Sequence, residues 1–186
     1  MTLEEQLSKL AGLGLTLSAD VTIDDLTYSF PRAVFERRPF DLLLFMLGVE
    51  VERAPWGRPF SPHAWNFDPE CISSTGDYTK IVKRLCRIAG RADCLAEISD
   101  FVDLATGQAW LKYRVGGIDR HWPVEVNNDW ADVLTLSYVM DDIQEGESYF
   151  YFKENGQAMV LFYLDPARAA EINALSGNAL KPFLSE

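Results

Sequence analysis

Carboxylates crowd residues 125–147 of the chain, and carboxylates can transfer protons, bind cations or meet a basic protein. The stretch "EVNNDWADVL" at 125–134 places Asp129 and Asp132 where a strand is predicted to give way to a helix. The helix dipole stabilises the ionised form of an acid there, whereas acid–base catalysis needs a raised pKa or a tight carboxylate pair. We therefore predict that these acids lie in the capped first turn of a helix, and we predict no catalytic residue.

The far end of the same predicted helix carries a second group of acids, Asp141, Asp142, Glu145 and Glu147, in the stretch "MDDIQEGE". Negative charge beside the C-terminus of a helix costs stability, so local folding does not explain these residues. A surface for a basic protein partner, such as a toxin, would explain them. We predict that these four acids, together with Asp129 and Asp132, bind that partner. The alternative is a solvated turn that adds solubility.

A second candidate site is a pocket near residues 55–70, where the proline-rich loop "APWGRPFSPH" precedes "WNFDPECI". Asp68 and Glu70 would project to the same side if they lay in a strand, which would allow a metal or a proton-transfer pair. Two acids are too few for a metal site, and the histidines His63 and His121 are far apart in sequence, so we predict no metal and no cofactor. The residues predicted to line this alternative pocket are Trp56, His63, Trp65, Asp68 and Glu70.

Nucleophilic chemistry has little support in the sequence, which lacks the G-x-S-x-G, H-E-x-x-H, Walker and G-x-G-x-x-G motifs. The three cysteines, Cys71, Cys86 and Cys94, have no paired spacing and are predicted to be free thiols that serve in packing. Cys71 follows two acids that would raise its pKa. Trp110 and Trp122 are either core residues or anchors of a protein interface.

The elements that must position these residues follow from periodicity and capping signals. Apolar spacing predicts helices after Thr2 and Thr22, at 39–47, between Asp77 and Gly90, at 129–143 and after Asp165. The segment 39–47 could also be a buried strand; we favour a helix, followed by a strand at 49–53. The helix before Gly90 has a basic face, which is either an anion site or a balance for acidic neighbours.

Two hairpins are predicted from alternating residues: "AWLKYRV" with "HWPVEV", and "SYFYFK" with "AMVLFYL" around Asn155-Gly156. The stretch "LAEISDFVDL" is predicted to add a fifth strand. The fold class is therefore α+β, with an antiparallel sheet of about five strands built from hairpins and helices packed mainly on one face. No linker or repeat divides the chain, so we predict a single domain over residues 1–186.

Charge narrows the classes of partner. With 17 basic and 28 acidic residues the 186-residue chain has a net charge of −11, which repels nucleic acid and anionic membranes and attracts basic proteins. The start of the chain lacks the pattern of a signal peptide and its longest apolar run is too short to span a bilayer, so we expect a cytoplasmic protein with no nucleic-acid or membrane partner.

The "DWAD" that opens the middle helix and the closing "NGQAMVLFYLDPARAAEINAL" resemble bacterial immunity proteins of polymorphic toxin systems. The resemblance implies a cytoplasmic protein that neutralises a cognate toxin by occluding it, but it carries over no site residue. We therefore predict a non-catalytic acidic protein-binding domain, an immunity-type inhibitor in its most concrete form. The alternative is a small enzyme or ligand-binding domain with the pocket near residues 55–70.

Overall fold

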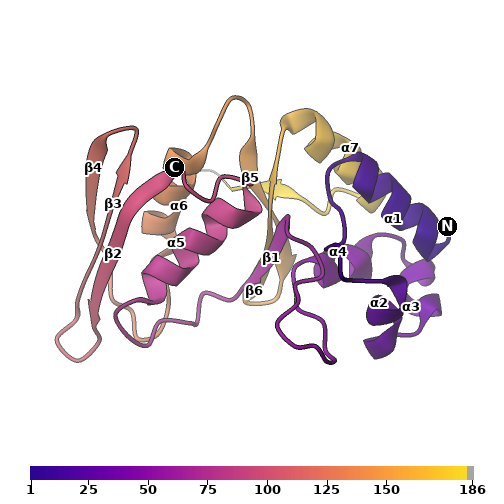
Figure 1. Cartoon of the computed structure of the whole chain (residues 1–186), viewed down its shortest axis with the longest axis horizontal. Coiled ribbons are helices and arrows are strands. Elements are labelled where there is room, and N and C mark those ends of the chain that lie inside the picture. Colours follow the sequence, from indigo (N-terminus) through magenta and orange to yellow (C-terminus); the bar gives the residue numbers. More distant parts are fainter. Residues whose placement is uncertain (184–186) are drawn as a thin grey trace. The chain divides into compact units, whose positions relative to one another are not determined.

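The structure, a computed structural model, describes residues 1–183. Contacts within the chain define two compact units: the first combines residues 1–67 with 150–182, and the second comprises residues 68–149 (Figure 1). The α+β class and the antiparallel pairing are confirmed. The prediction of a single domain concerns how the two units fold together, and it stays a prediction.

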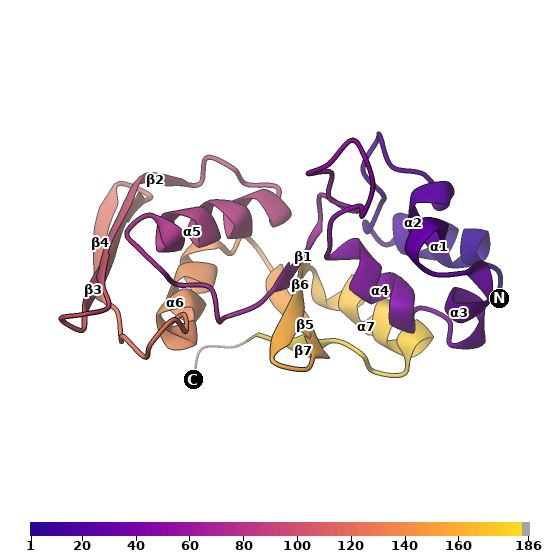
Figure 2. The ribbon, with the colours of Figure 1, turned by 90° about the horizontal axis from the view of Figure 1, so that it is seen from below.

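The first unit holds most of the helices and a four-stranded sheet in the order β1-β6-β5-β7. Its elements are α1 (Leu3–Gly12), α2 (Ile23–Ser29), α3 (Arg32–Arg37), α4 (Asp41–Leu47), β1 (Ala64–Phe67), β5 (Tyr149–Asn155), β6 (Ala158–Leu164), α7 (Pro166–Ser176) and β7 (Lys181–Pro182). Figures 1 and 2 show α1, α4 and α7 on the same side of this sheet. The predicted helix start at Thr2 is confirmed, because Thr2 and Glu5 form both hydrogen bonds of a capping box.

The ambiguous segment 39–47 is a helix, as favoured, and runs from Asp41 to Leu47. The strand predicted at 49–53 is wrong, since this stretch forms only one isolated bridge, between Glu50 and Pro59. The facing loop contains prolines, which have no amide hydrogen to donate to a strand ladder.

Gly48 explains how α4 can approach β1. The Gly48 carbonyl accepts a hydrogen bond of 2.7 Å from the amide of Asn66. A Cβ atom on Gly48 would lie 2.8 Å from that same amide nitrogen and 2.6 Å from a methyl carbon of Val160. The close approach therefore requires glycine at this position.

The second unit consists of a three-stranded antiparallel sheet, β2-β3-β4, and two helices. Its elements are α5 (Asp77–Ile88), β2 (Leu95–Asp103), β3 (Gln108–Val115), β4 (Ile118–Pro123) and α6 (Val133–Ile143). Figures 1 and 2 show α5 and α6 on the same face of the sheet. The predicted apolar stripe of α5 faces inward, with Tyr78, Val82 and Leu85 buried, and β3 contributes Leu111 and Tyr113 to the same core.

The prediction of one sheet of about five strands is wrong, because the two hairpins lie in different sheets. The hairpin β5-β6 pairs with β1, in the register Ala64 to Phe162, whereas β3-β4 pairs with β2. Such pairing between distant segments is not encoded in local periodicity. Within residues 1–183, no helix combines the length and apolar character needed to cross a bilayer.

Candidate functional site

The start of α6 differs from the prediction in a way that separates Asp129 from Asp132. The helix begins at Val133, with Asp132 as the N-cap whose carboxylate accepts the Thr135 amide at 3.0 Å. Capping by Asp132 fixes the first helical residue, so the placement of Asp129 in the first turn is wrong. Asp129 is exposed in the preceding turn, and Trp130 also lies outside the helix, with 37% of its surface exposed.

At the C-terminal end of α6, the carboxylate of Asp142 turns toward the sheet. It accepts hydrogen bonds of 3.0 and 2.9 Å from the guanidinium of Arg120 and one of 2.7 Å from the hydroxyl of Tyr113. Only 14% of the Asp142 side chain is exposed. Asp142 therefore joins α6 to β3 and β4, and it is not a surface acid.

The same cluster continues into the core beneath the sheet. The Trp122 indole donates to the Tyr113 hydroxyl at 3.0 Å and stacks on Tyr138 of α6, with the ring centroids 4.9 Å apart. Burial, together with the hydrogen bond to the Asp142 carboxylate, raises the pKa of Tyr113. Of the two hairpin tryptophans, both half-buried, Trp122 is thus the one that packs against α6.

Arg91, which follows α5, offsets the negative end of the α6 dipole. Its guanidinium donates to the carbonyls of Ile143 and Gln144 and lies 3.4 Å from the carboxylate of Glu145. A cation at this position is what a helix C-terminus favours. The premise that folding leaves the acids at this end unexplained therefore fails for Asp142 and is weakened for Glu145.

Three of the four acids at this end remain at the surface: Asp141, Glu145 and Glu147 are all exposed. The Asp141 carboxylate accepts a hydrogen bond from the side-chain amide of Gln144 at 3.2 Å. The side chain of Glu145 is 71% exposed despite its pairing with Arg91. We call these three residues the acidic segment; their assignment to partner binding stays a prediction.

The alternative site near residues 55–70 is divided between the two units, and it also stays a prediction. In the first unit Trp56 is 74% exposed, burial lowers the pKa of His63, and the ring of Trp65 lies 4.8 Å from that of Phe67. In the second unit the Asp68 carboxylate accepts the amide of Glu70 at 3.0 Å. Because β1 ends at Phe67, these two acids are not in a strand, and the premise that a strand aligns them is wrong.

The cysteines are free thiols in the structure, and Cys86 is buried. Partial desolvation of the Cys71 thiol and the nearby carboxylates of Asp68 and Asp77 raise its pKa to about 11. The direction is the one predicted, but the second acid is Asp77 and not Glu70. Among residues 1–183, no group of three histidine, cysteine, aspartate or glutamate side chains is placed to hold a metal ion.

Three buried carboxylates that hold the fold were not among the predicted site residues. Asp100 on β2 accepts the amides of Gly76 and Thr79 at the start of α5, at 2.7 and 3.1 Å. Burial opposes ionisation of Asp25 and Asp77, but hydrogen bonds from amides and from cationic side chains outweigh it and lower the pKa of each well below the usual range. Capping-box spacing at Thr22 pointed to Asp25, whereas Asp100 gave no local signal.

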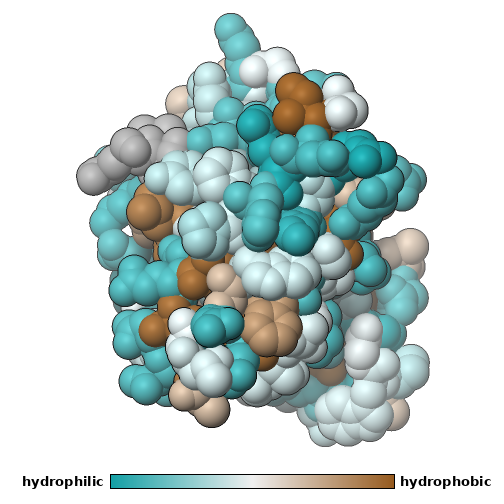
Figure 3. All heavy atoms as spheres, turned by 90° about the vertical axis from the view of Figure 1, so that its left-hand side faces the viewer, coloured by the Kyte–Doolittle hydropathy of each residue, from teal (hydrophilic) through white to brown (hydrophobic). Residues whose placement is uncertain are grey.

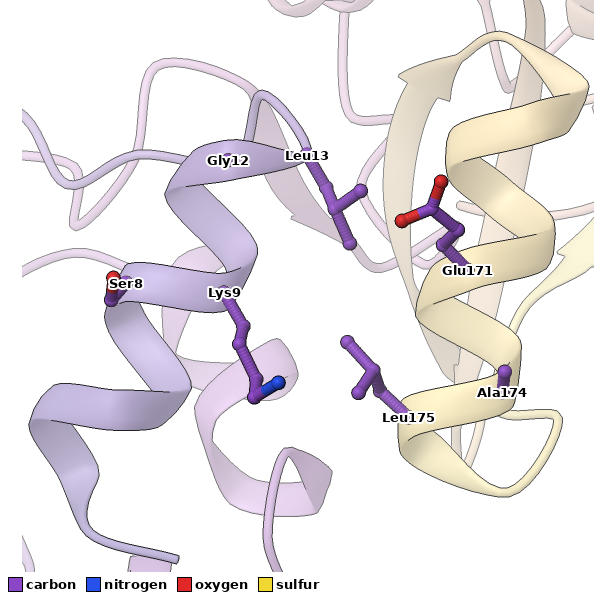
Figure 4. Close-up of a pocket in the computed structure, with 7 residues that line it drawn as sticks. All are labelled: Ser8, Lys9, Gly12, Leu13, Glu171, Ala174 and Leu175. Carbon is purple, nitrogen blue, oxygen red and sulfur yellow. The ribbon is translucent and has the colours of Figure 1, made fainter.

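Cavities of moderate size occur in both units, lined by residues other than the predicted site residues. A cavity of about 540 Å³ separates α1 from α7, and the side chains of Lys9, Leu13, Glu171 and Leu175 point into it (Figure 4). In the second unit, a cavity of about 420 Å³ lies beside the basic face of α5. Its lining contains the basic residues Lys83 and Arg87 and also the acids Asp93 and Glu97, so the cavity is not a purely anion-binding environment.

The outer face of the three-stranded sheet carries the other hairpin tryptophan. Trp110 stacks on Phe101 at a centroid distance of 6.1 Å, and the Lys112 ammonium lies 4.4 Å from the centre of the Trp110 ring system. A shallow cavity of about 330 Å³ on the same sheet is lined by Lys112, Arg114 and His121 among others. Figure 3, which views this side of Figure 1, shows a mainly hydrophilic surface with isolated hydrophobic residues.

Comparison of the chain with models of protein families, with curated proteins and with solved structures gave no match. The resemblance to immunity proteins therefore stays a prediction, and the function has to be inferred from the residues of this chain.

Proposed function

We propose that the chain is a non-catalytic, acidic protein-binding protein whose partner is a basic protein, as for an immunity-type inhibitor and its toxin. The observation that carries this proposal is the acidic segment. Asp141, Glu145 and Glu147 are all exposed at one end of α6, in a chain whose net charge is −11. Exposed acids at this end of a helix can contact the surface of a cationic partner.

Charge and apolar contacts would have separate roles in this recognition. The negative electrostatic field of the protein accelerates its encounter with a basic partner. Salt screens this field, with a screening length of about 8 Å at physiological ionic strength. Affinity needs a desolvated anchor as well. The residues at the start of α6 supply candidates, because Trp130 is 37% exposed and Leu134 is 56% exposed, beside the exposed acid Asp129.

The proposal is tested by capturing binding proteins from the native organism at low and at moderate salt, and then measuring association of the purified partner. The test variant combines Asp141→Asn, Glu145→Gln and Glu147→Gln. We expect its association at low salt to slow on the order of tenfold, because surface charges act mainly on the rate of encounter.

The control variant has the same change in net charge placed elsewhere: Asp20→Asn, Asp24→Asn and Glu50→Gln replace three exposed acids of the first unit. If both variants slow association equally, overall charge acts rather than the acidic segment. Capture of only acidic or neutral proteins, or a partner whose activity the chain leaves unchanged when the two are co-expressed, would contradict the inhibitor role.

The alternative function, a ligand-binding or small catalytic domain with a pocket near residues 55–70, is favoured by one observation. Trp56 is 74% exposed in its loop, a position where an aromatic side chain could cover a ligand. Thermal unfolding in the presence of divalent metals and a metabolite panel tests it. A stabilising ligand whose effect is lost in Trp56→Ala would support this function over the first.

A further inference from the structure

The turn after α5 brings two cysteines together. Gly90 adopts the left-handed conformation (φ +70°), its amide donates to the Arg87 carbonyl at 2.9 Å, and the Arg91 amide donates to the Cys86 carbonyl at 2.8 Å. These two bonds form a Schellman motif, which reverses the chain at the end of a helix. A further bond of 3.0 Å, from the Cys94 amide to the Arg91 carbonyl, completes the return.

As a result, the Sγ atoms of Cys86 and Cys94 lie 3.7 Å apart, in contact but not bonded. Cys86 is fully buried, whereas Cys94 is half-buried and thus reachable from solvent. A disulfide bond needs an S–S distance of about 2 Å, so the two sulfur atoms must approach each other by less than about 2 Å for the bond to form. We propose that Cys86 and Cys94 are a redox-sensitive thiol pair, which low-molecular-weight disulfides such as oxidised glutathione convert into an intramolecular disulfide. This inference is independent of the proposed function.

The exchange proceeds in two steps that balance. The Cys94 thiol loses its proton, and its thiolate attacks one sulfur of oxidised glutathione, forming a mixed disulfide and releasing one glutathione thiolate. The Cys86 thiol then loses its proton, and its sulfur attacks Sγ of Cys94 and releases the second glutathione. The two protein thiols are oxidised, one glutathione disulfide is reduced, and the two protons pass to the departing thiolates.

The accessible partner must react first, which fits the positions of the two thiols. Burial and the neighbouring Cys94 thiol raise the pKa of Cys86 to about 12, so Cys86 is a poor attacker of a free disulfide. In the second step, Cys86 attacks a sulfur atom that it already contacts. Because this step is intramolecular, it can proceed even when only a small fraction of Cys86 is thiolate.

The crosslink would also act on α6, because it closes a loop that contains Arg91. The guanidinium of Arg91 donates to the carbonyls of Ile143 and Gln144, and it pairs with Glu145 of the acidic segment. Restricting this loop holds Arg91 in place, and amide hydrogen exchange at the C-terminal end of α6 should slow. Redox state would thereby set the rigidity of the segment that carries the exposed acids.

The experiment equilibrates the intact chain with reduced and oxidised glutathione at several ratios, followed by alkylation of free thiols and mass analysis. Trypsin separates the two cysteines, since it cuts after Arg84, Arg87 and Arg91. The expected product joins peptide 85–87 to peptide 92–112, with the mass of two thiol hydrogens missing. The oxidised chain should unfold at a temperature about 5 °C above that of the reduced chain.

Two variants provide the controls. Cys71→Ser removes the third cysteine and should leave the crosslink unchanged, whereas Cys94→Ser, a substitution at a half-buried site, should abolish it. Glutathione found on Cys94 with Cys86 still free at every ratio would overturn the proposal. A crosslink that forms without slower exchange in residues 139–144 would overturn only its coupling to α6.

Discussion

Replacing Tyr113 with phenylalanine tests whether Asp142 belongs to the fold or to a binding surface. The substitution keeps the ring and removes only the hydroxyl, which donates to the Asp142 carboxylate at 2.7 Å and accepts from the Trp122 indole at 3.0 Å. Tyr113 is 2% exposed, so water cannot replace either partner without a rearrangement of the core. If Asp142 is an internal residue, losing this hydroxyl must be costly.

The magnitude follows from the two hydrogen bonds. A hydrogen bond to a charged group contributes about 1.5–3 kcal/mol, and a buried donor left without an acceptor costs about 1–3 kcal/mol. Asp142 keeps its two bonds from Arg120, and the Trp122 indole can recover part of its loss by a small shift. Because both partners recover part of their loss, we expect Tyr113→Phe to lower the free energy of unfolding by about 2 kcal/mol, somewhat less than the sum of the two contributions.

Equilibrium unfolding in urea, followed by tryptophan fluorescence, measures the effect. At a typical slope, 2 kcal/mol corresponds to a midpoint lowered by about 1 M urea with the slope unchanged. Tyr28→Phe is the matched control, because it makes the same chemical change at a residue that is 60% exposed and should alter stability by less than about 0.5 kcal/mol. Equal shifts in the two variants would refute the internal role of Asp142 and return it to the acids available for binding.

Three further predictions address the fold and the site. The pKa of Asp25 is lowered in the folded state, so the stability that its ionised carboxylate provides is complete above about pH 4 and falls as the pH drops toward the folded-state pKa. Below about pH 5, the urea midpoint of Asp25→Asn should therefore fall less steeply with decreasing pH than that of the unsubstituted protein. Gly48→Ala should destabilise the protein by about 1–3 kcal/mol through overpacking, whereas Gly12→Ala, with no atom within 4 Å of the added carbon, should be neutral or stabilising in thermal unfolding. Asp132→Ala should cost about 1 kcal/mol of unfolding free energy through loss of the α6 cap, while Asp129→Ala should cost almost none; equal losses would contradict the observed helix start.

Much of the local structure could be predicted because its causes are local. The stripe of α5 needs only a period of 3.6 residues, its end at Gly90 needs only a left-handed turn, and the hairpin at Asn155-Gly156 needs only turn chemistry. The start of α6 was misplaced because two aspartates competed as early helical residues. Only the structure shows that Asp132 binds the Thr135 amide.

The remaining errors concern partners that are distant in the sequence. Arg91 and Arg120 bind residues of α6 that are 52 and 22 residues away in the sequence. Nothing in the sequence around either arginine identifies it as a partner of α6. One signal was available for Arg120: the Gly116-Gly117 turn sets a register that places this residue opposite Tyr113, on the inner face of the hairpin. An arginine directed inward requires an acid, so the search for that acid would have led to Asp142.

The helix dipole therefore accounts for the position of an acid only after the cations that can reach the helix have been counted. Asp142 and, in part, Glu145 are accounted for by arginines of the chain, and the exposed Glu147 is the acid on which the recognition proposal can be tested most directly. Folding and recognition should then separate in a pair of variants. Asp142→Asn should lower the unfolding midpoint, whereas Glu147→Gln should leave the midpoint unchanged and slow association with the partner at low salt. If Glu147→Gln leaves the association rate unchanged at both salt concentrations while Asp142→Asn reduces it without a loss of stability, the roles given to these two acids are reversed.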